Sequence, residues 1–120
     1  MKLPNGNRAV IDPEKLRDYI LNPEHPGNGG KAAYFQALGF GKADWAELAD
    51  ALHRIAESEE ISHVVASDFG RKYIQDGGLP LPGGGVAGIR LIWIIEPERD
   101  FPRLVTAYPR DVEEPNDSGT

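Results

Sequence analysis

The fold is decided by residues 43–65, ADWAELADALHRIAESEEISHVV, where the spacing of the apolar residues changes. Up to residue 57 these residues recur at three- and four-residue steps, the spacing of one helix face. They are Trp45, Leu48, Ala49, Leu52, Ile55 and Ala56. From Ile61 onward the chain is rich in branched apolar residues, which favour a strand. The stretch therefore predicts a helix over about residues 43–57, followed by the first strand of a sheet.

Two further helices are predicted on the N-terminal side of this stretch. Asp12 is a good N-cap and Pro13 suits the first helical position, so a helix is expected to begin here and to end near Leu21. A second helix is expected to begin at Lys31 and to end at Gly39, which suits the position just after a helix. The first half of the chain is therefore expected to be helical.

The second half has the pattern of a sheet. Strands are predicted over residues 61–65, 70–75, 86–95 and 102–108, with glycine-rich turns at 77–78 and 83–85 and a short additional strand at 8–11. Helices followed by strands indicate an α+β fold, in which three N-terminal helices pack on one face of a twisted antiparallel sheet. Residues 1–109 are expected to form a single domain and residues 110–120 a disordered acidic tail.

The composition excludes several classes of protein. The absence of cysteine rules out disulfides and thiolate metal sites, and the spacing of the three histidines predicts no metal centre. We therefore expect no metal and no cofactor. The net charge of −6 argues against non-specific binding to nucleic acid. No apolar run approaches the roughly 20 residues that span a bilayer, so a cytoplasmic protein without a membrane partner is expected.

One segment combines a proton-transfer group with a cation. Prolines flank His25 and restrict its backbone, glycines follow it, and Lys31 opens the next helix. Such a segment suits phosphate chemistry without a metal, but it equally suits an ordinary connection between helices. The candidate catalytic residues are His25, Lys31 and Thr106.

Polar residues on the predicted strands complete this candidate site. Strand alternation places Thr106 and Tyr108 on the face of Leu104, and Arg103 on the other face. Arg90, Arg103 and Tyr108 are the candidate substrate-binding residues. A threonine, an arginine and a histidine around one phosphodiester can cleave RNA, because the ribose 2′-hydroxyl is the nucleophile. The alternative is that Thr106 is simply a strand former and the arginines make salt bridges at the rim.

The chain also resembles a known group of proteins. The motifs are His25-Pro26-Gly27, Lys31-Ala32, Leu38-Gly39, Phe69-Gly70 and residues 101–106, FPRLVT, together with Phe35, Tyr73, Trp93 and Tyr108. Over nearly all of residues 1–109 they are similar to an uncharacterised group of small bacterial domains. That group in turn is similar to the toxin domains at the C-termini of contact-dependent inhibition proteins, which share the fold of barnase, RelE and the colicin-type ribonucleases.

The resemblance implies a metal-independent ribonuclease, often a tRNA nuclease, that a cognate immunity protein or antitoxin neutralises. By position it implies His25, Lys31 and Thr106 as active residues, with Arg90 and Arg103 as weaker candidates. The chain departs from related toxins in having Phe69 in place of a tyrosine and Ile92 in place of a small polar residue. Two other hypotheses stay open: a binding module or regulator in a toxin–antitoxin-type pair that has lost catalysis, and an unrelated α+β protein that binds a small anion.

Overall fold

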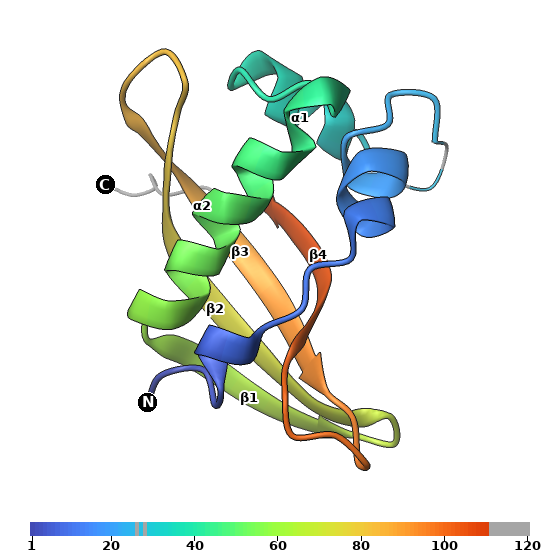
Figure 1. The fold of residues 1–120 in the computed structure, drawn as a ribbon, viewed down its shortest axis with the longest axis vertical. Helices are drawn as coiled ribbons and strands as arrows, with labels where there is room; N and C mark the ends of the chain where they lie inside the picture. Colours follow the sequence, from blue (N-terminus) through green and yellow to red (C-terminus); the bar gives the residue numbers. More distant parts are fainter. Residues whose placement is uncertain (26, 28, 111–120) are drawn as a thin grey trace, which may run out of the picture.

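The computed structural model describes residues 1–25, 27 and 29–110. In this part of the chain the helices are α1 (Lys31–Ala37) and α2 (Trp45–Ser58), with a π-helical segment η2 (Lys15–Ile20) and 3-10 turns η1 (Gly6–Arg8) and η4 (Lys42–Asp44). The strands β1 (Ile61–Ser67), β2 (Gly70–Pro80), β3 (Val86–Ile95) and β4 (Arg103–Pro109) form one antiparallel sheet in sequence order (Figure 1). The prediction of an α+β fold with a four-stranded antiparallel sheet after the helices is confirmed.

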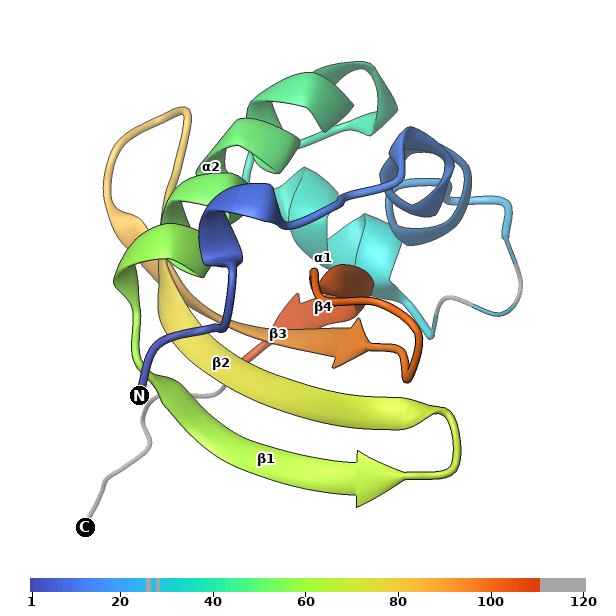
Figure 2. The same ribbon diagram turned by 60° about the horizontal axis from the view of Figure 1, so that its bottom comes forward.

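Helix α2 covers one face of the sheet (Figure 2). The predicted spacing holds along this helix: Leu48, Leu52 and Ile55 are buried, whereas Trp45 at its first turn is only half-buried. From the sheet, Leu91, Trp93 and Leu104 are buried in the same core. The core therefore lies between α2 and this face of the sheet, which we call the inner face.

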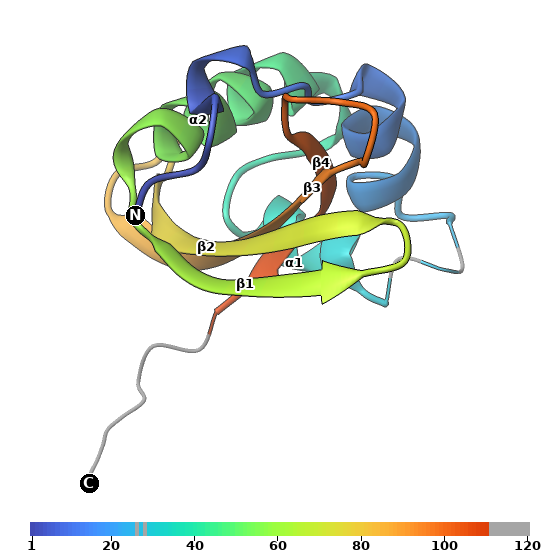
Figure 3. The ribbon, with the colours of Figure 1, turned by 90° about the horizontal axis from the view of Figure 1, so that it is seen from below.

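The other helical segments lie differently from the prediction. Segments η2 and α1 pack against β4, the edge strand, and η2 also contacts α2. The predicted first helix is wound as a π-helix, in which the Leu21 N–H donates to the Leu16 carbonyl five residues earlier. Leu16, Ile20 and Phe35 still contribute to the core. The expectation of three helices on one face is thus not confirmed as stated, because α1 lies beside β4 at the edge of the sheet (Figure 3). The sheet is only mildly twisted.

Two strand boundaries also differ from the prediction. The glycines at 77 and 78, expected in a turn, lie inside β2, which runs to Pro80. A Cβ at Gly77 would lie 2.9 Å from Cγ2 of Ile55, so glycine at this position lets α2 approach the sheet closely. The short strand expected at residues 8–11 is reduced to one parallel bridge between Val10 and Arg103.

Strand β4 contains a bulge that changes which side chains share a face. Ile92 pairs with Thr106 but its neighbour Trp93 pairs with Leu104, so Val105 has no opposite residue. The extra residue breaks the alternation along β4. As a result Leu104 and Ala107 face the core, whereas Thr106 lies on the opposite face with Ile92. The prediction that Thr106 and Tyr108 share the face of Leu104 is therefore wrong.

Among the residues that the structure describes, one polar side chain lies in the core: Gln75, which is fully buried. The indole Nε1–H of Trp93 donates to Gln75 Oε1 at 2.9 Å, and Gln75 Nε2 donates to the carbonyls of Glu59 at 2.9 Å and Ala56 at 3.5 Å. Both polar ends of the glutamine side chain are therefore satisfied. These bonds connect β2 and β3 to the C-terminal end of α2.

The predicted acidic tail at 110–120 falls outside the described residues except for Arg110. The Arg110 N–H donates to the Gly88 carbonyl, so this residue continues the edge of the sheet. In the part of the chain that the structure describes, no helix is long and apolar enough to cross a membrane.

Candidate functional site

The face of the sheet opposite α2, the outer face, carries a row of three polar side chains on neighbouring strands. Asp76 on β2 pairs with Arg90 on β3, which in turn pairs with Tyr108 on β4. A second row, one step further along the strands, joins Ile92 to Thr106. The bulge in β4 brings Thr106 and Tyr108 onto this face, since regular alternation from Leu104 would direct them into the core.

Arg90 and Asp76 form a bidentate ion pair. Arg90 Nε donates to Asp76 Oδ1 at 2.7 Å and Arg90 Nη2 donates to Oδ2 at 2.9 Å, while Arg110 Nε lies 3.3 Å from Oδ2. The side chains of Asp76 and Arg90 are 16% and 28% exposed. One carboxylate thus faces two guanidinium groups, and the cluster carries a net positive charge.

The ion pair shifts the pKa of both partners. The hydrogen bonds from Arg90 lower the pKa of Asp76, with smaller contributions from the charges of Arg110 and His63, although burial opposes the shift. The hydrogen bonds to Asp76 raise the pKa of Arg90, and Tyr108 beside it adds a smaller rise. Both groups therefore stay charged at neutral pH. An added anion can therefore bind only to guanidinium N–H groups of Arg90 or Arg110 that do not already donate to the Asp76 carboxylate.

Thr106 presents a hydroxyl that is buried next to this row. Its Oγ1 has no hydrogen-bond partner among the described residues. Buried hydroxyl groups are nearly always bonded, so this one is an exception among the described residues. Its oxygen is enclosed by the surrounding atoms and is not open to a ligand in this arrangement.

His25 and Lys31 each contact the ring of Tyr19. The His25 ring lies edge-on to Tyr19 with centroids 4.9 Å apart, and the Lys31 ammonium lies 5.8 Å from the Tyr19 centroid. The Gly27 N–H donates to His25 Nδ1 at 3.0 Å. Since Nδ1 accepts this bond, the neutral imidazole carries its proton on Nε2. In this arrangement His25 is a hydrogen-bond donor.

Lys31, but not His25, lines a hollow beside the end of β4. Lys31 and Tyr34 of α1 line it on one side, Tyr108 and Pro109 on the other, with a volume of about 220 Å³. The Tyr34 hydroxyl donates to the Gly88 carbonyl at 3.5 Å, which attaches α1 to the sheet. Tyr108 is the shared residue, because it lines this hollow and also pairs with Arg90. Lys31, Tyr108 and Arg90 therefore form one continuous surface.

Arg103 does not belong to this surface. It lies at the start of β4, opposite Ile94, and its Nη2 donates to Glu96 Oε2 at 3.3 Å. The sequence hypothesis grouped it with Arg90, but the structure places it in another row of the sheet. Its side chain is instead part of an ion pair at the rim.

Sequence reasoning missed Asp76, Arg110 and His63 as members of the cluster. Asp76 lies between the predicted strand 70–75 and the predicted turn 77–78, and Arg110 falls in the predicted tail. His63 pairs opposite Ile74 on the outer face, and its Nδ1 lies 2.8 Å from Ser62 Oγ. Only the pairing of β2 with β3 reveals that Asp76 lies opposite Arg90, because no local pattern marks that register.

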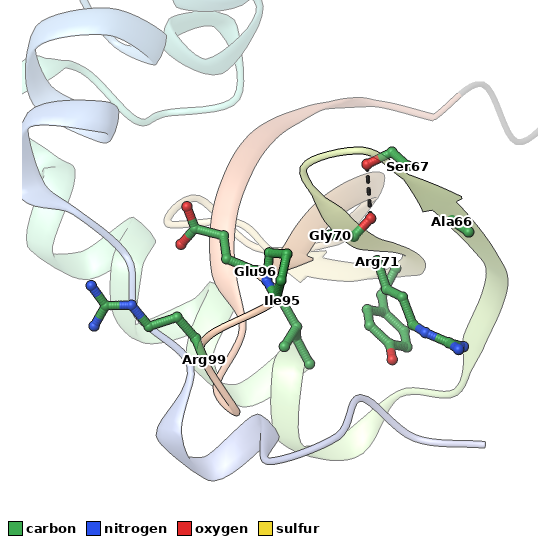
Figure 4. A pocket seen from close by; sticks show the side chains of 9 residues that line it. Ala66, Ser67, Gly70, Arg71, Ile95, Glu96 and Arg99 are labelled. Atoms are coloured by element: carbon green, nitrogen blue, oxygen red, sulfur yellow. Dashed lines mark hydrogen bonds between the residues drawn. The ribbon is translucent and has the colours of Figure 1, made fainter.

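A second hollow, of about 370 Å³, lies at the other end of the sheet (Figure 4). Ala66, Tyr73 and Ile95 line it together with two arginines, Arg71 and Arg99. The two guanidinium groups point away from each other, so this hollow has no convergent cation pair. Among the described residues no cluster of three or more histidine, aspartate and glutamate side chains is arranged to hold a metal ion.

Comparison with known proteins supports the fold and identifies the family. One solved structure that is similar to this chain is described as a contact-dependent growth inhibition toxin - immunity protein complex from Klebsiella pneumoniae 342, with a TM-score of 0.68 and 16% sequence identity. The match covers 84% of this chain and 99% of that chain, and at this identity it shows a related fold alone. No curated protein matches the sequence. Residues 2–111 match the family described as "Domain of unknown function (DUF6883)", and the chain belongs to that family.

Proposed function

We propose that the outer face binds and cleaves RNA without a metal ion, using the surface formed by Lys31, Tyr108 and Arg90. The observation that carries this proposal is the meeting of two cations from distant parts of the sequence at Tyr108, in a chain whose overall charge is −6. A phosphodiester is an anion that such a surface suits. Thr106 lies on the same face of the sheet, and its enclosed hydroxyl has no partner among the described residues.

The proposed reaction uses the substrate's own nucleophile. The ribose 2′-oxygen attacks phosphorus, the bond from phosphorus to the 5′-oxygen breaks, and one proton moves from the 2′-hydroxyl to the leaving 5′-oxygen. The products are a 2′,3′-cyclic phosphate and a 5′-hydroxyl. Lys31 and Arg90 stabilise the charge that develops on the phosphate, and His25 carries the proton. In the described arrangement Nε2 already carries the ring proton and Nδ1 accepts from Gly27. His25 therefore takes the 2′-hydroxyl proton on Nδ1 after the bond from the Gly27 N–H opens, and gives the Nε2 proton to the leaving 5′-oxygen.

The likeness to a toxin–immunity complex supports a partner protein. One chain of that complex shares this fold, and its printed description names a toxin and an immunity protein. We infer that this chain acts on RNA, with tRNA as the first substrate to test, and that an antitoxin or immunity protein binds it. The cytoplasm is the compartment where such a substrate is found.

A second function is favoured by the state of Arg90. Its guanidinium already holds the Asp76 carboxylate through two short hydrogen bonds, so a phosphate must compete with Asp76. This arrangement favours a protein that binds a partner without catalysing a reaction, such as a binding module or regulator in a toxin–antitoxin-type pair. In this case the surface would recognise a partner and no RNA would be cut.

The test is an RNA-cleavage assay with the purified chain and bulk tRNA in the presence of a chelator. We expect fragments that end in 2′,3′-cyclic phosphate. His25→Ala should slow cleavage by about 10²–10⁴-fold, the contribution of a positioned proton-transfer group. Lys31→Ala should reduce both binding and turnover. His53→Ala, on α2 and outside the site, is the matched control and should leave the rate unchanged.

Two results would count against the ribonuclease. Cleavage that His25→Ala leaves unchanged would exclude the proton-transfer role of that residue. Binding of RNA without any cleavage at neutral pH would support the binding module instead, because the surface would then recognise the substrate without carrying out chemistry.

A further inference from the structure

Strand β1 forms one edge of the sheet and leaves most of its outer edge unpaired (Figures 2 and 3). Among the described residues only the N-terminus lies beside this edge, at its beginning: the Ile61 N–H donates to the Met1 carbonyl, and Lys2 bridges to Glu60. From Ser62 to Ser67 no described segment pairs with it. The backbone N–H and C=O groups on this side are therefore available to another strand.

The side chains of β1 do nothing to block such pairing. Edge strands are commonly protected by lysine, by proline, by inward-pointing charges or by a bulge. Strand β1 has one register irregularity, between Ile61 and His63, so regular pairing is expected only beyond it. The sequence from Ile61 to Ser67, ISHVVAS, contains no proline and no lysine, arginine, aspartate or glutamate. All of its residues after Ile61 are exposed, including Val64 at 41% and Val65 at 47%. The edge is uncharged, and its side chains after Ile61 are exposed on both faces of the sheet.

We propose that β1 pairs antiparallel with β1 of a second copy of this chain, about a two-fold axis perpendicular to the sheet. A two-fold axis in this orientation keeps both α2 helices on the same side and joins the two sheets into one. Residues that lie opposite one another then belong to the same face. The axis passes beside Val64 or Val65, near the middle of the unpaired segment.

The lack of charge in β1 makes the strand compatible with a second copy of itself. The net charge of −6 opposes association of two copies in general. Strand β1 contains no lysine, arginine, aspartate or glutamate, so pairing two copies of it places no like charges opposite each other within the strand. The partner strand must itself be extended, uncharged and unpaired. Strand β1 of a second copy has all three properties, because it is the same strand.

The ends of the strand fit the same arrangement. Phe69 at the turn after β1 is 76% exposed, and Met1 beside the start of β1 is 64% exposed. Antiparallel pairing places the turn of one copy next to the start of β1 in the other. Phe69 therefore approaches Met1 of the second copy, and two exposed apolar side chains leave water together.

The test is the mass of the full chain in solution, measured by sedimentation velocity over a range of concentrations. We expect a species of two chains, against 13.1 kDa for one. Val64→Lys and Val65→Lys should each weaken the dimer about a hundredfold or more, because they place positive charges against the partner strand. Val86→Lys, at a valine that is 69% exposed outside β1, is the matched control and should leave the dimer intact.

Hydrogen exchange provides a second measurement that does not depend on mass. Amides of Ser62–Ser67 that point outward should be protected in the dimer and should exchange rapidly in Val65→Lys, whose circular dichroism should remain unchanged. A chain that stays monomeric at every concentration would overturn the proposal. So would a dimer that survives both lysine substitutions in β1, or one that Val86→Lys dissociates equally.

Discussion

Replacing Gln75 with leucine tests the polar link inside the core. The leucine has a similar size but cannot accept the bond from Trp93 Nε1 or donate to the carbonyls of Glu59 and Ala56. The indole N–H then loses its partner in a fully buried position. A polar group left in this state costs about 1–3 kcal/mol, and the partly buried Glu59 carbonyl adds a smaller amount. We expect Gln75→Leu to lower the free energy of unfolding by about 2–4 kcal/mol.

A double-mutant cycle separates this polar effect from simple loss of packing. Trp93→Phe removes the donor and leaves Gln75 Oε1 unsatisfied, so it should also cost about 2–4 kcal/mol. In the double variant neither polar group remains. Its destabilisation should therefore be smaller than the sum of the two single effects by about 1–3 kcal/mol.

The assay is urea unfolding followed by circular dichroism, with Gln36→Leu as the control. Gln36 is the other glutamine of the chain and is exposed on α1, so its replacement should change stability by no more than about 0.5 kcal/mol. Strictly additive effects of Gln75→Leu and Trp93→Phe would refute the reasoning. They would show that Gln75 and Trp93 contribute independently to stability. The hydrogen bond between them would then not stabilise the core between α2 and the sheet.

Two further predictions concern the sheet. Arg90 lowers the pKa of Asp76, so the ion pair stabilises the fold above the unfolded pKa of about 4 and loses this effect as pH falls through the lower folded value. Urea unfolding at several pH values should therefore show a cost of Asp76→Asn that shrinks below about pH 4, and a cost independent of pH would contradict the ion-pair explanation. Gly70 has φ +128°, and a Cβ there would lie 2.3 Å from the Ile95 carbonyl oxygen. Gly70→Ala should thus cost at least about 1–3 kcal/mol, whereas Gly83→Ala, where a Cβ meets nothing within 4 Å, should be nearly neutral; equal thermal stability of the two variants would refute this.

The elements of the fold that follow local rules could be predicted from the sequence. Helix α2 follows from the spacing of Leu48, Leu52 and Ile55, because one apolar stripe must face a core. Strand β3 follows from its run of branched residues. The arrangement of η2 and α1 beside β4 could not be predicted, since it depends on how the helices pack and no local pattern records it.

The candidate site was harder to predict, because it depends on register. One extra residue at Val105 moves Thr106 and Tyr108 from the inner to the outer face, and the sequence FPRLVTAY carries no mark of that bulge. The pairing of Asp76 with Arg90 likewise depends on how β2 aligns with β3. His25 and Lys31 are close in sequence, which suggests that they act together. Their shared contact with Tyr19 of η2 could not be predicted, because it depends on how that segment packs.

The most direct test of the proposed RNA site is an NMR titration of the full chain with an oligonucleotide that lacks 2′-hydroxyls and so cannot be cleaved. We predict chemical-shift changes centred on Lys31, Arg90 and Tyr108, binding that weakens steeply with added salt, and weaker binding by Lys31→Ala. Because no cleavage is required, this measurement examines recognition by the outer face separately from catalysis. Shifts confined to Arg71 and Arg99 in the other hollow, or no shifts at all, would contradict the assignment of the site.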